Sequence, residues 1–179
     1  MKDVSAATTT FPARRVVSSR APSFADAAER HLDDVYRYLL VLTRDASLAE
    51  DLAAETFERA LRSWRRFDPA RSSPRTWLCT IARSTALDHY RAEKRRRNRE
   101  RAVSEAEGHL EQPELGLSPA LERALAALTA ADREVVAVRI VLDLDAEQAA
   151  RMLGISTTAC TTRLSRALKR LEELMSDDD

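Results

Sequence analysis

Residues 145–169 carry side chains suited to contacting DNA. A helix-compatible stretch ends at Gly154, whose missing Cβ suits a sharp turn, and Ser156 can cap the helix that follows. That second helix keeps apolar residues on one stripe, and its other faces carry Thr161, Thr162, Arg163, Ser165, Arg166, Lys169 and Arg170. Hydroxyl and guanidinium groups on an exposed helix face can read the major groove. The pattern predicts a helix-turn-helix, although a helical hairpin with a solvated basic face would share it.

A second region suited to nucleic acid is a long helix predicted from Pro74 to about Arg99, with the basic residues that continue to Arg101. Six of the eight residues 94–101 are Lys or Arg, and so dense a run repels itself unless an anion neutralises it. Such cations bind phosphates and release counterions. Before this run, the same predicted helix carries spaced cations and aromatic residues, namely Arg75, Arg83, Arg91, Trp77, His89 and Tyr90. Aromatic rings can hold unstacked bases, but Trp77 alone is better explained as core.

The carboxylates near residue 50 allow two interpretations. Ser47 and Glu50 have the spacing of a capping box, which predicts that a helix begins there. Asp51 and Glu55 are like charges one turn apart, which is mildly unfavourable in an isolated helix. They suit a protein partner with a basic surface, but acids in a first turn are also stabilised by the helix dipole. The spacing does not choose between these interpretations.

Neither catalysis nor a cofactor is predicted. His31, His89 and His109 are scattered, and the chain has no Gly-rich phosphate loop or nucleophile elbow. Cys79 and Cys160 lack partners at metal-ligand spacing, so we expect no metal and two reduced, packed thiols. No stretch approaches 18 uninterrupted apolar residues, so no membrane insertion is expected. These features together favour a cytoplasmic protein.

Composition and helix-start signals predict an all-α chain of two small domains. Of 179 residues, 44% are hydrophobic, only 5% are aromatic and three are glycine. Serine or threonine caps at Ser23, Ser73, Ser118 and Thr129 mark helix starts, two of them followed by proline. Residues 103–117 hold carboxylates and no Lys or Arg. We predict a disordered tail over 1–22, a helical domain over 23–100, a flexible acidic linker over 101–117 and a helix-turn-helix domain over 118–176.

Taken in order along the chain, these motifs resemble a bacterial RNA polymerase sigma factor of the extracytoplasmic-function group. The matching segments are 49–57, 76–83 and 86–91 before the linker, and 132–136, 153–156 and 163–167 after it. The resemblance covers about residues 24–100 and 118–172. It implies a region 2-like bundle and a region 4-like helix-turn-helix. It also implies a non-enzymatic subunit that directs promoter-specific initiation and assists promoter melting.

The resemblance further implies three binding surfaces. Contacts with core RNA polymerase are expected from Asp51, Leu52, Glu55 and Phe57. Contacts with the minus-ten element, partly as a melted strand, are expected from Phe67, Ser73, Ser84, Asp88, Arg91, Lys94 and Arg95. Contacts with the duplex minus-thirty-five element are expected from Thr158, Thr161, Thr162, Arg163, Ser165 and Arg166. An anti-sigma factor is a further candidate partner.

Several positions depart from the family's pattern. Ala54 replaces a frequent Gln, Ser84 replaces a frequent Asn, and Thr161 replaces a frequent base. Ser84 keeps a donor and an acceptor with shorter reach, so an altered minus-ten base preference is expected. Two rival classes remain open at this point. The first is a stand-alone dimeric regulator, which would leave the basic first domain without a role and would need a dimer surface, whereas the chain has no long heptad seam. The second is a helical adaptor, whose basic faces would simply be solvated.

Overall fold

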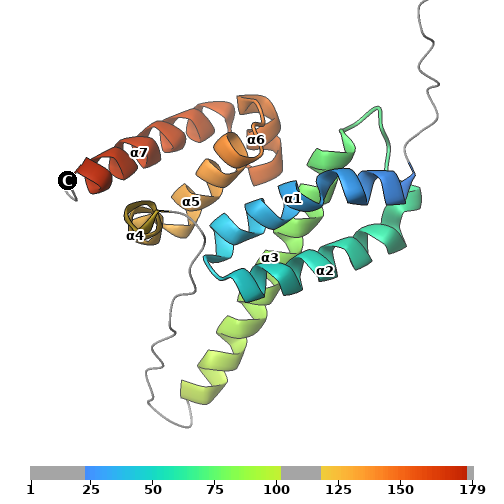
Figure 1. Ribbon diagram of the computed structural model, residues 1–179, viewed down its shortest axis with the longest axis horizontal. Helices are drawn as coiled ribbons and strands as arrows, with labels where there is room; N and C mark the ends of the chain where they lie inside the picture. The colour runs from blue at the N-terminus through green and yellow to red at the C-terminus, as the bar shows by residue number, and fades with distance from the viewer. Residues whose placement is uncertain (1–22, 102–117, 177–179) are drawn as a thin grey trace, which may run out of the picture.

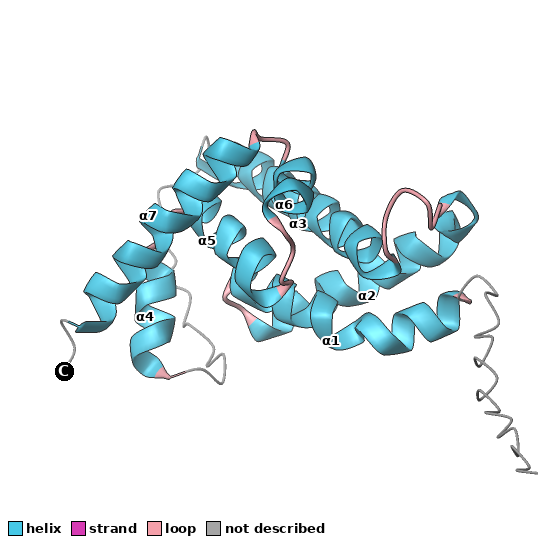
Figure 2. Cartoon of the chain, turned by 90° about the horizontal axis from the view of Figure 1, so that it is seen from above, coloured by secondary structure: helices cyan, strands magenta, loops and turns pink. Residues whose placement is uncertain are grey.

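The computed structural model describes residues 23–101 and 118–176, and all regular secondary structure within these ranges is helical. The predicted tail over 1–22 and the linker residues 102–117 lie outside the described residues. Figures 1 and 2 show two groups of helices, one built from α1 to α3 and one from α4 to α7. The all-α prediction is confirmed.

The first group contains α1 (Phe24–Thr43), α2 (Ala46–Ser63), the 3-10 turn η1 (Trp64–Arg66) and α3 (Pro74–Arg101). The helices α1, α2 and α3 pack on one another through apolar side chains that are at most 2% exposed, among them Val35, Leu39, Leu52, Leu78, Ala82 and Ala86. Apolar residues recur at helical spacing on each helix, so burying one stripe per helix closes the bundle. The C-terminal half of α3 extends beyond this bundle (Figure 1).

Helix starts in this group follow the predicted caps at Ser23 and Ser73 but not at Ser47. Ser23 forms a capping box with Asp26 at the start of α1, and the Ser73 hydroxyl accepts the Thr76 N–H at 3.1 Å. The carboxylate of Asp45 accepts the Leu48 N–H at 2.9 Å, so Asp45 caps α2 and Ser47 lies inside its first turn. An aspartate is as favourable at the N-cap position as a serine, and in α2 Asp45 occupies that position two residues before Ser47.

The second group contains α4 (Pro119–Ala127), α5 (Ala130–Val136), the π-helical segment η2 (Ala137–Val141), α6 (Ala146–Leu153) and α7 (Thr157–Ser176). The predicted caps Ser118 and Thr129 accept backbone N–H groups at the starts of α4 and α5. A further capping box joins Asp145 and Gln148 at the start of α6. The helices enclose a core that includes Leu125, Val135, Val138, Leu142 and Ala149.

The two groups pack against each other through α1, which contacts α5 and η2. Polar contacts join them from α3. The Nε atom of Arg83 lies 2.8 Å from Oε1 of Glu134, and Nη1 of Arg75 donates to the Leu142 carbonyl at 2.6 Å. Tyr38 on α1 is fully buried, and its hydroxyl has no hydrogen-bond partner among the described residues. The contact between the groups therefore includes polar atoms as well as apolar ones.

Candidate nucleic-acid and protein interfaces

The first candidate surface is the outer face of α7. Gly154 adopts a left-handed conformation with φ of 70°, which lets the chain turn sharply between α6 and α7. The Ser156 hydroxyl then accepts the Ala159 N–H at 3.1 Å and caps α7. Both features match the predicted helix-turn-helix.

The burial pattern of α7 separates a core stripe from an open face. Cys160, Ala167 and Leu171 are buried, and the helix packs on α4, α5 and α6. The face predicted to read the minus-thirty-five element is exposed at Thr158, Thr161, Thr162, Ser165 and Arg166, and half-buried at Arg163. Neither Arg163 nor Arg166 is ion-paired with another described residue. Two guanidinium groups are thus free for an external anion or base.

The second candidate surface is a stripe along α3. Ser84, Asp88, Arg91 and Arg95 follow one another at spacings of four, three and four residues, which places them on one helix face. Ser84, Arg91 and Arg95 are exposed, and Lys94 beside them is exposed as well. Asp88 is half-exposed, and its two carboxylate oxygens face Arg59 at 2.8 Å and Arg91 at 3.5 Å. The stripe therefore offers a hydroxyl, a carboxylate and several cations in order along one face.

The basic run at the end of α3 is partly neutralised by the chain itself. Glu93 forms ion pairs with Arg96 and Arg97, each at 3.0 Å. Hydrogen bonds from these two guanidinium groups lower the pKa of Glu93 to about 2. Arg75 and Arg83 are also engaged, with Asp34 and Glu134 respectively. These four residues, predicted as part of a nucleic-acid surface, thus already have a carboxylate partner within the chain.

The loop between α2 and α3 rests on an aromatic cluster. Phe67 stacks on Trp64 with ring centroids 4.8 Å apart, and both rings contact Trp77 at 5.5 Å. Phe24 closes the cluster against Trp64 at 5.6 Å. Trp77 is partly buried against the core, as predicted. Phe67 is half-buried in the same cluster, so in this structure it anchors the loop while its remaining surface faces solvent.

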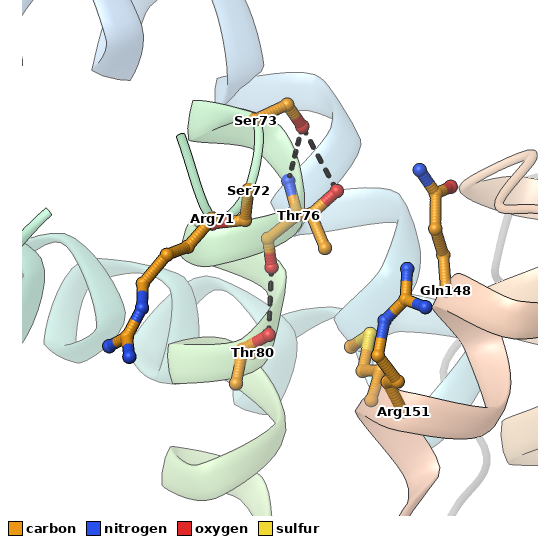
Figure 3. A pocket seen from close by; sticks show the side chains of 8 residues that line it. Arg71, Ser72, Ser73, Thr76, Thr80, Gln148 and Arg151 are labelled. Atoms are coloured by element: carbon orange, nitrogen blue, oxygen red, sulfur yellow. Dashed lines mark hydrogen bonds between the residues drawn. The ribbon is translucent and has the colours of Figure 1, made fainter. Parts of the chain in front are cut away.

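An open cleft of about 250 Å³ separates this loop and the start of α3 from α6. Figure 3 shows Gln148 and Arg151 of α6 opposite Thr76 and Thr80 of α3, with the Arg71 side chain directed away. Ser73 lies at the rim, and its Oγ is 2.9 Å from Oγ1 of Thr76. The predicted minus-ten residue Ser73 thus caps α3 and borders the cleft.

The third candidate surface is the exposed side of α2. Asp51 and Glu55 are exposed and Phe57 is half-buried, so all three are open to a partner. Leu52, which the resemblance groups with them, is only 2% exposed and lies in the core of the bundle. The Leu52 side chain therefore packs beneath the surface and is too buried to contact the polymerase directly.

Sequence reasoning missed Arg59, which links the second and third surfaces. Its two terminal nitrogens donate to Glu55 at 2.6 Å and to Asp88 at 2.8 Å. The bond to Asp88 raises the pKa of Arg59 and lowers the pKa of Asp88. The four-residue spacing from Glu55 was a visible signal, whereas Asp88 lies 29 residues away and nothing in the spacing indicated it.

The remaining reactive groups are packed. Both cysteines are fully buried, and burial raises the pKa of the Cys79 thiol to about 12. Within residues 23–101 and 118–176, His, Cys, Asp and Glu form no group of three or more that could hold a metal ion. In the same part of the chain, no helix is long and apolar enough to cross a membrane.

Comparison with known proteins gives the same organisation. The Sigma-70 region 2 model matches residues 27–96, and the Sigma-70 region 4 model matches residues 118–171. Over 175 residues the chain is 31% identical to the ECF RNA polymerase sigma factor BldN of Streptomyces coelicolor, covering 92% of this chain and 64% of that protein. It is 32% identical over 163 residues to the RNA polymerase sigma factor YlaC of Bacillus subtilis, covering 86% and 92%.

A solved structure supports the same conclusion. The sigma factor RpoE from Bartonella quintana, in complex with the anti-sigma factor NepR, superposes with a TM-score of 0.73 and 25% identity, over 87% of this chain and 98% of that one. A stand-alone regulator or an adaptor would not account for the region 2 match. The chain belongs to the extracytoplasmic-function group of RNA polymerase sigma factors, which bind core polymerase and direct promoter-specific initiation without catalysing a reaction themselves.

Proposed function

We propose that the two helical groups divide promoter recognition between them, with domain limits at residues 23–100 and 118–176. The exposed face of α7 reads the duplex minus-thirty-five element. The α3 stripe and the loop after α2 capture the minus-ten element as its strands separate. The exposed acids of α2 bind core polymerase.

One observation carries the assignment of α7. Cys160, Ala167 and Leu171 are buried while the opposite face keeps Arg163 and Arg166 unpaired among the described residues. Leaving two guanidinium groups without an intramolecular partner is what base-edge or phosphate contacts require. Thr161 fits a smaller role, because its hydroxyl donates to the Thr157 carbonyl at 3.0 Å. It is left with lone pairs to accept a hydrogen bond but has no free donor.

The minus-ten assignment follows from charge and reach along α3. Arg91, Lys94 and Arg95 are exposed cations that follow Ser84 and Asp88 along α3, so they supply phosphate contacts that fix the strand. Ser84 then offers a short hydroxyl to an extruded base. A shorter side chain favours a smaller set of contacts than an amide would make, so the preferred base at that position should differ from the usual one of the family.

The polymerase assignment rests on exposed acids. Asp51 and Glu55 present carboxylates on one side of α2, whereas Phe57, half-buried against the core, lies on a different side of the helix and would need a separate contact. A basic polymerase surface would match the acids. The working compartment follows from the partner, so we infer a cytoplasmic location. An anti-sigma partner is inferred from likeness to the Bartonella sigma factor crystallised with one.

Transcription reconstituted from purified parts tests the division of roles. Run-off transcripts are measured with cognate core polymerase and a mapped promoter, using D51K, R91A and R166A as probes of the three surfaces. D51K should weaken core binding, R91A should lower strand opening, and R166A should lower binding to the minus-thirty-five duplex. If D51K leaves core binding intact, or if R166A and R91A affect the same promoter element, the proposed division is wrong.

A further inference from the structure

Arg59 joins α2 to α3 at a point where two proposed binding surfaces meet. Its Nη2 donates to Oε1 of Glu55 at 2.6 Å within α2, and its Nη1 donates to Oδ2 of Asp88 at 2.8 Å on α3. The other Asp88 oxygen lies 3.5 Å from Nη1 of Arg91. Four charged groups therefore alternate in sign from the polymerase-facing acid to the DNA-facing cation.

The geometry of the guanidinium group makes this arrangement possible. Its planar fork presents two nitrogens in fixed directions, so one side chain can hold two carboxylates at once. A lysine ammonium is a compact point charge on a flexible stem and does not reproduce that geometry. The Arg59 side chain is 37% exposed and both carboxylates are 46% exposed, so water and partners can reach all three groups.

We propose that Arg59 is a positioning residue for minus-ten recognition, because it binds one Asp88 oxygen at 2.8 Å and thereby limits the competing pair between the other oxygen and Arg91, which lies 3.5 Å away. This inference rests on the proposed minus-ten role of the α3 stripe. Without Arg59, the nearest cation to Asp88 in its own helix is Arg91. The carboxylate would then pair more closely with Arg91 than at the present 3.5 Å and withdraw positive charge from the DNA, where each phosphate contact depends on a cation.

The polymerase side should respond in the opposite sense. Glu55 now shares its carboxylate with Arg59, so removing the guanidinium frees an exposed acid on the proposed docking face. Core binding should therefore stay constant or tighten while promoter opening falls. A substitution that merely loosened the bundle would lower both.

The chain contains a matched control. Arg62 pairs with Glu58 one turn away on α2 at 3.0 Å, the same residue types and spacing as Arg59 with Glu55. Both Arg62 and Glu58 are well exposed, at 75% and 64%. Arg62 makes no ion pair to α3 among the described residues. R62M thus removes an equivalent surface pair without touching Asp88.

The test uses the full-length chain with its cognate core polymerase and a promoter fixed by transcript mapping. The variants are R59M, R59K, D88N, the double variant R59M/D88N, and R62M. Thermal melting of each free chain checks the fold, titration with core gives binding, and run-off transcripts with permanganate footprints give promoter opening. R59M should lower opening about three- to fivefold, the range an exposed ion pair reaches, and core binding should not weaken. R59K should lower opening to nearly the same extent.

The double variant decides the mechanism. If Arg59 acts through Asp88, R59M should cost nothing further in the D88N background. An equal cost in both backgrounds, an equal loss of core binding, or the same loss in R62M would overturn the proposal. R91A separates it from the proposed function. If R91A leaves opening unchanged, the minus-ten role of the stripe is wrong, whereas a harmful R91A with a harmless R59M contradicts only the role of Arg59.

Discussion

The outer faces of α3 and α7 are both rich in hydroxyls and cations, yet the two helices use them differently. On α7, Arg163 and Arg166 have no ion-pair partner among the described residues. On α3, Arg75, Arg83, Arg96 and Arg97 are paired with carboxylates of the same chain. The α7 face is thus ready for an external ligand, whereas much of the positive charge of α3 already has an internal partner.

The difference separates structural cations from those free to bind DNA. Arg83 and Glu134 are 24% and 15% exposed, so their ion pair is partly desolvated and joins the two helical groups. Arg91, Lys94 and Arg95 lie further along α3 and stay exposed. This later part of α3 resembles α7 more closely, because Lys94 and Arg95 have no ion-pair partner among the described residues and Arg91 has only a 3.5 Å contact with Asp88. Promoter contacts from α3 should therefore concentrate on this part of the helix.

The largest expected effect comes from breaking the partly buried pair. R83M leaves the Glu134 carboxylate with little solvent and without its cation, which costs more than the pair's net worth. The free energy of unfolding should fall by about 2–3 kcal/mol in urea denaturation. R91M is the control on the same helix and should change stability by less than about 0.5 kcal/mol. Equal losses of stability in the two variants would show that the ion pair between Arg83 and Glu134 does not stabilise the fold more than an exposed arginine does.

The free cations of α7 should show the reverse behaviour. R166A should leave stability unchanged and weaken promoter binding by about 1–3 kcal/mol if the guanidinium contacts a base. Binding is measured by titrating holoenzyme onto promoters with single-base changes in the minus-thirty-five element. T161A should lose much less, because the Thr161 hydroxyl already donates to the helix backbone. A uniform loss for R166A on every sequence would make it a phosphate contact and not a base reader.

The same contrast explains what could be predicted from the sequence. The turn and the start of α7 can be predicted because its turn glycine and Ser156 cap are local features. Of the apolar stripe predicted from spacing, Cys160, Ala167 and Leu171 are buried, whereas Leu168 and Met175 are exposed. The caps at Ser23, Ser118 and Thr129 were equally visible. Ser47 and Glu50 have the spacing of a capping box, but α2 begins two residues earlier, where the Asp45 carboxylate accepts the Leu48 N–H.

Partners distant in the sequence could not be predicted in this way. Arg83 pairs with a residue 51 positions away and Arg59 with one 29 positions away, so spacing within one helix gives no hint of either contact. Leu52 was grouped with polymerase contacts through the resemblance, although its helical position puts it in the core. Pattern identifies which face of a helix is polar, but packing decides which polar residues remain free.

The contact between the two helical groups can be probed at Tyr38. Burial raises the pKa of Tyr38 well above its usual value, and within the part of the chain that the structure describes its hydroxyl has no hydrogen-bond partner. Burying a hydroxyl that makes no hydrogen bond costs desolvation free energy that nothing offsets. Y38F should therefore raise the free energy of unfolding by about 1 kcal/mol. Y36F on the partly buried neighbour is the control, and its stability should stay within about 0.5 kcal/mol of the wild type. A loss of stability in Y38F would mean that the hydroxyl has a partner in solution.

The smallest expected effect is the pH dependence contributed by Cys79 on the buried side of α3. Its pKa is about 12 in the folded chain against a usual 9.0, because burial disfavours the thiolate. The folded state therefore keeps a proton that the unfolded chain releases, and the contribution of Cys79 to stability is complete below pH 9 and lost as pH rises toward 12. At about pH 9.5 the loss should be just under about 1 kcal/mol. Urea denaturation at several pH values should give a shallower decline for C79A than for the wild type, and parallel declines would show that the thiol ionises equally well in the folded chain.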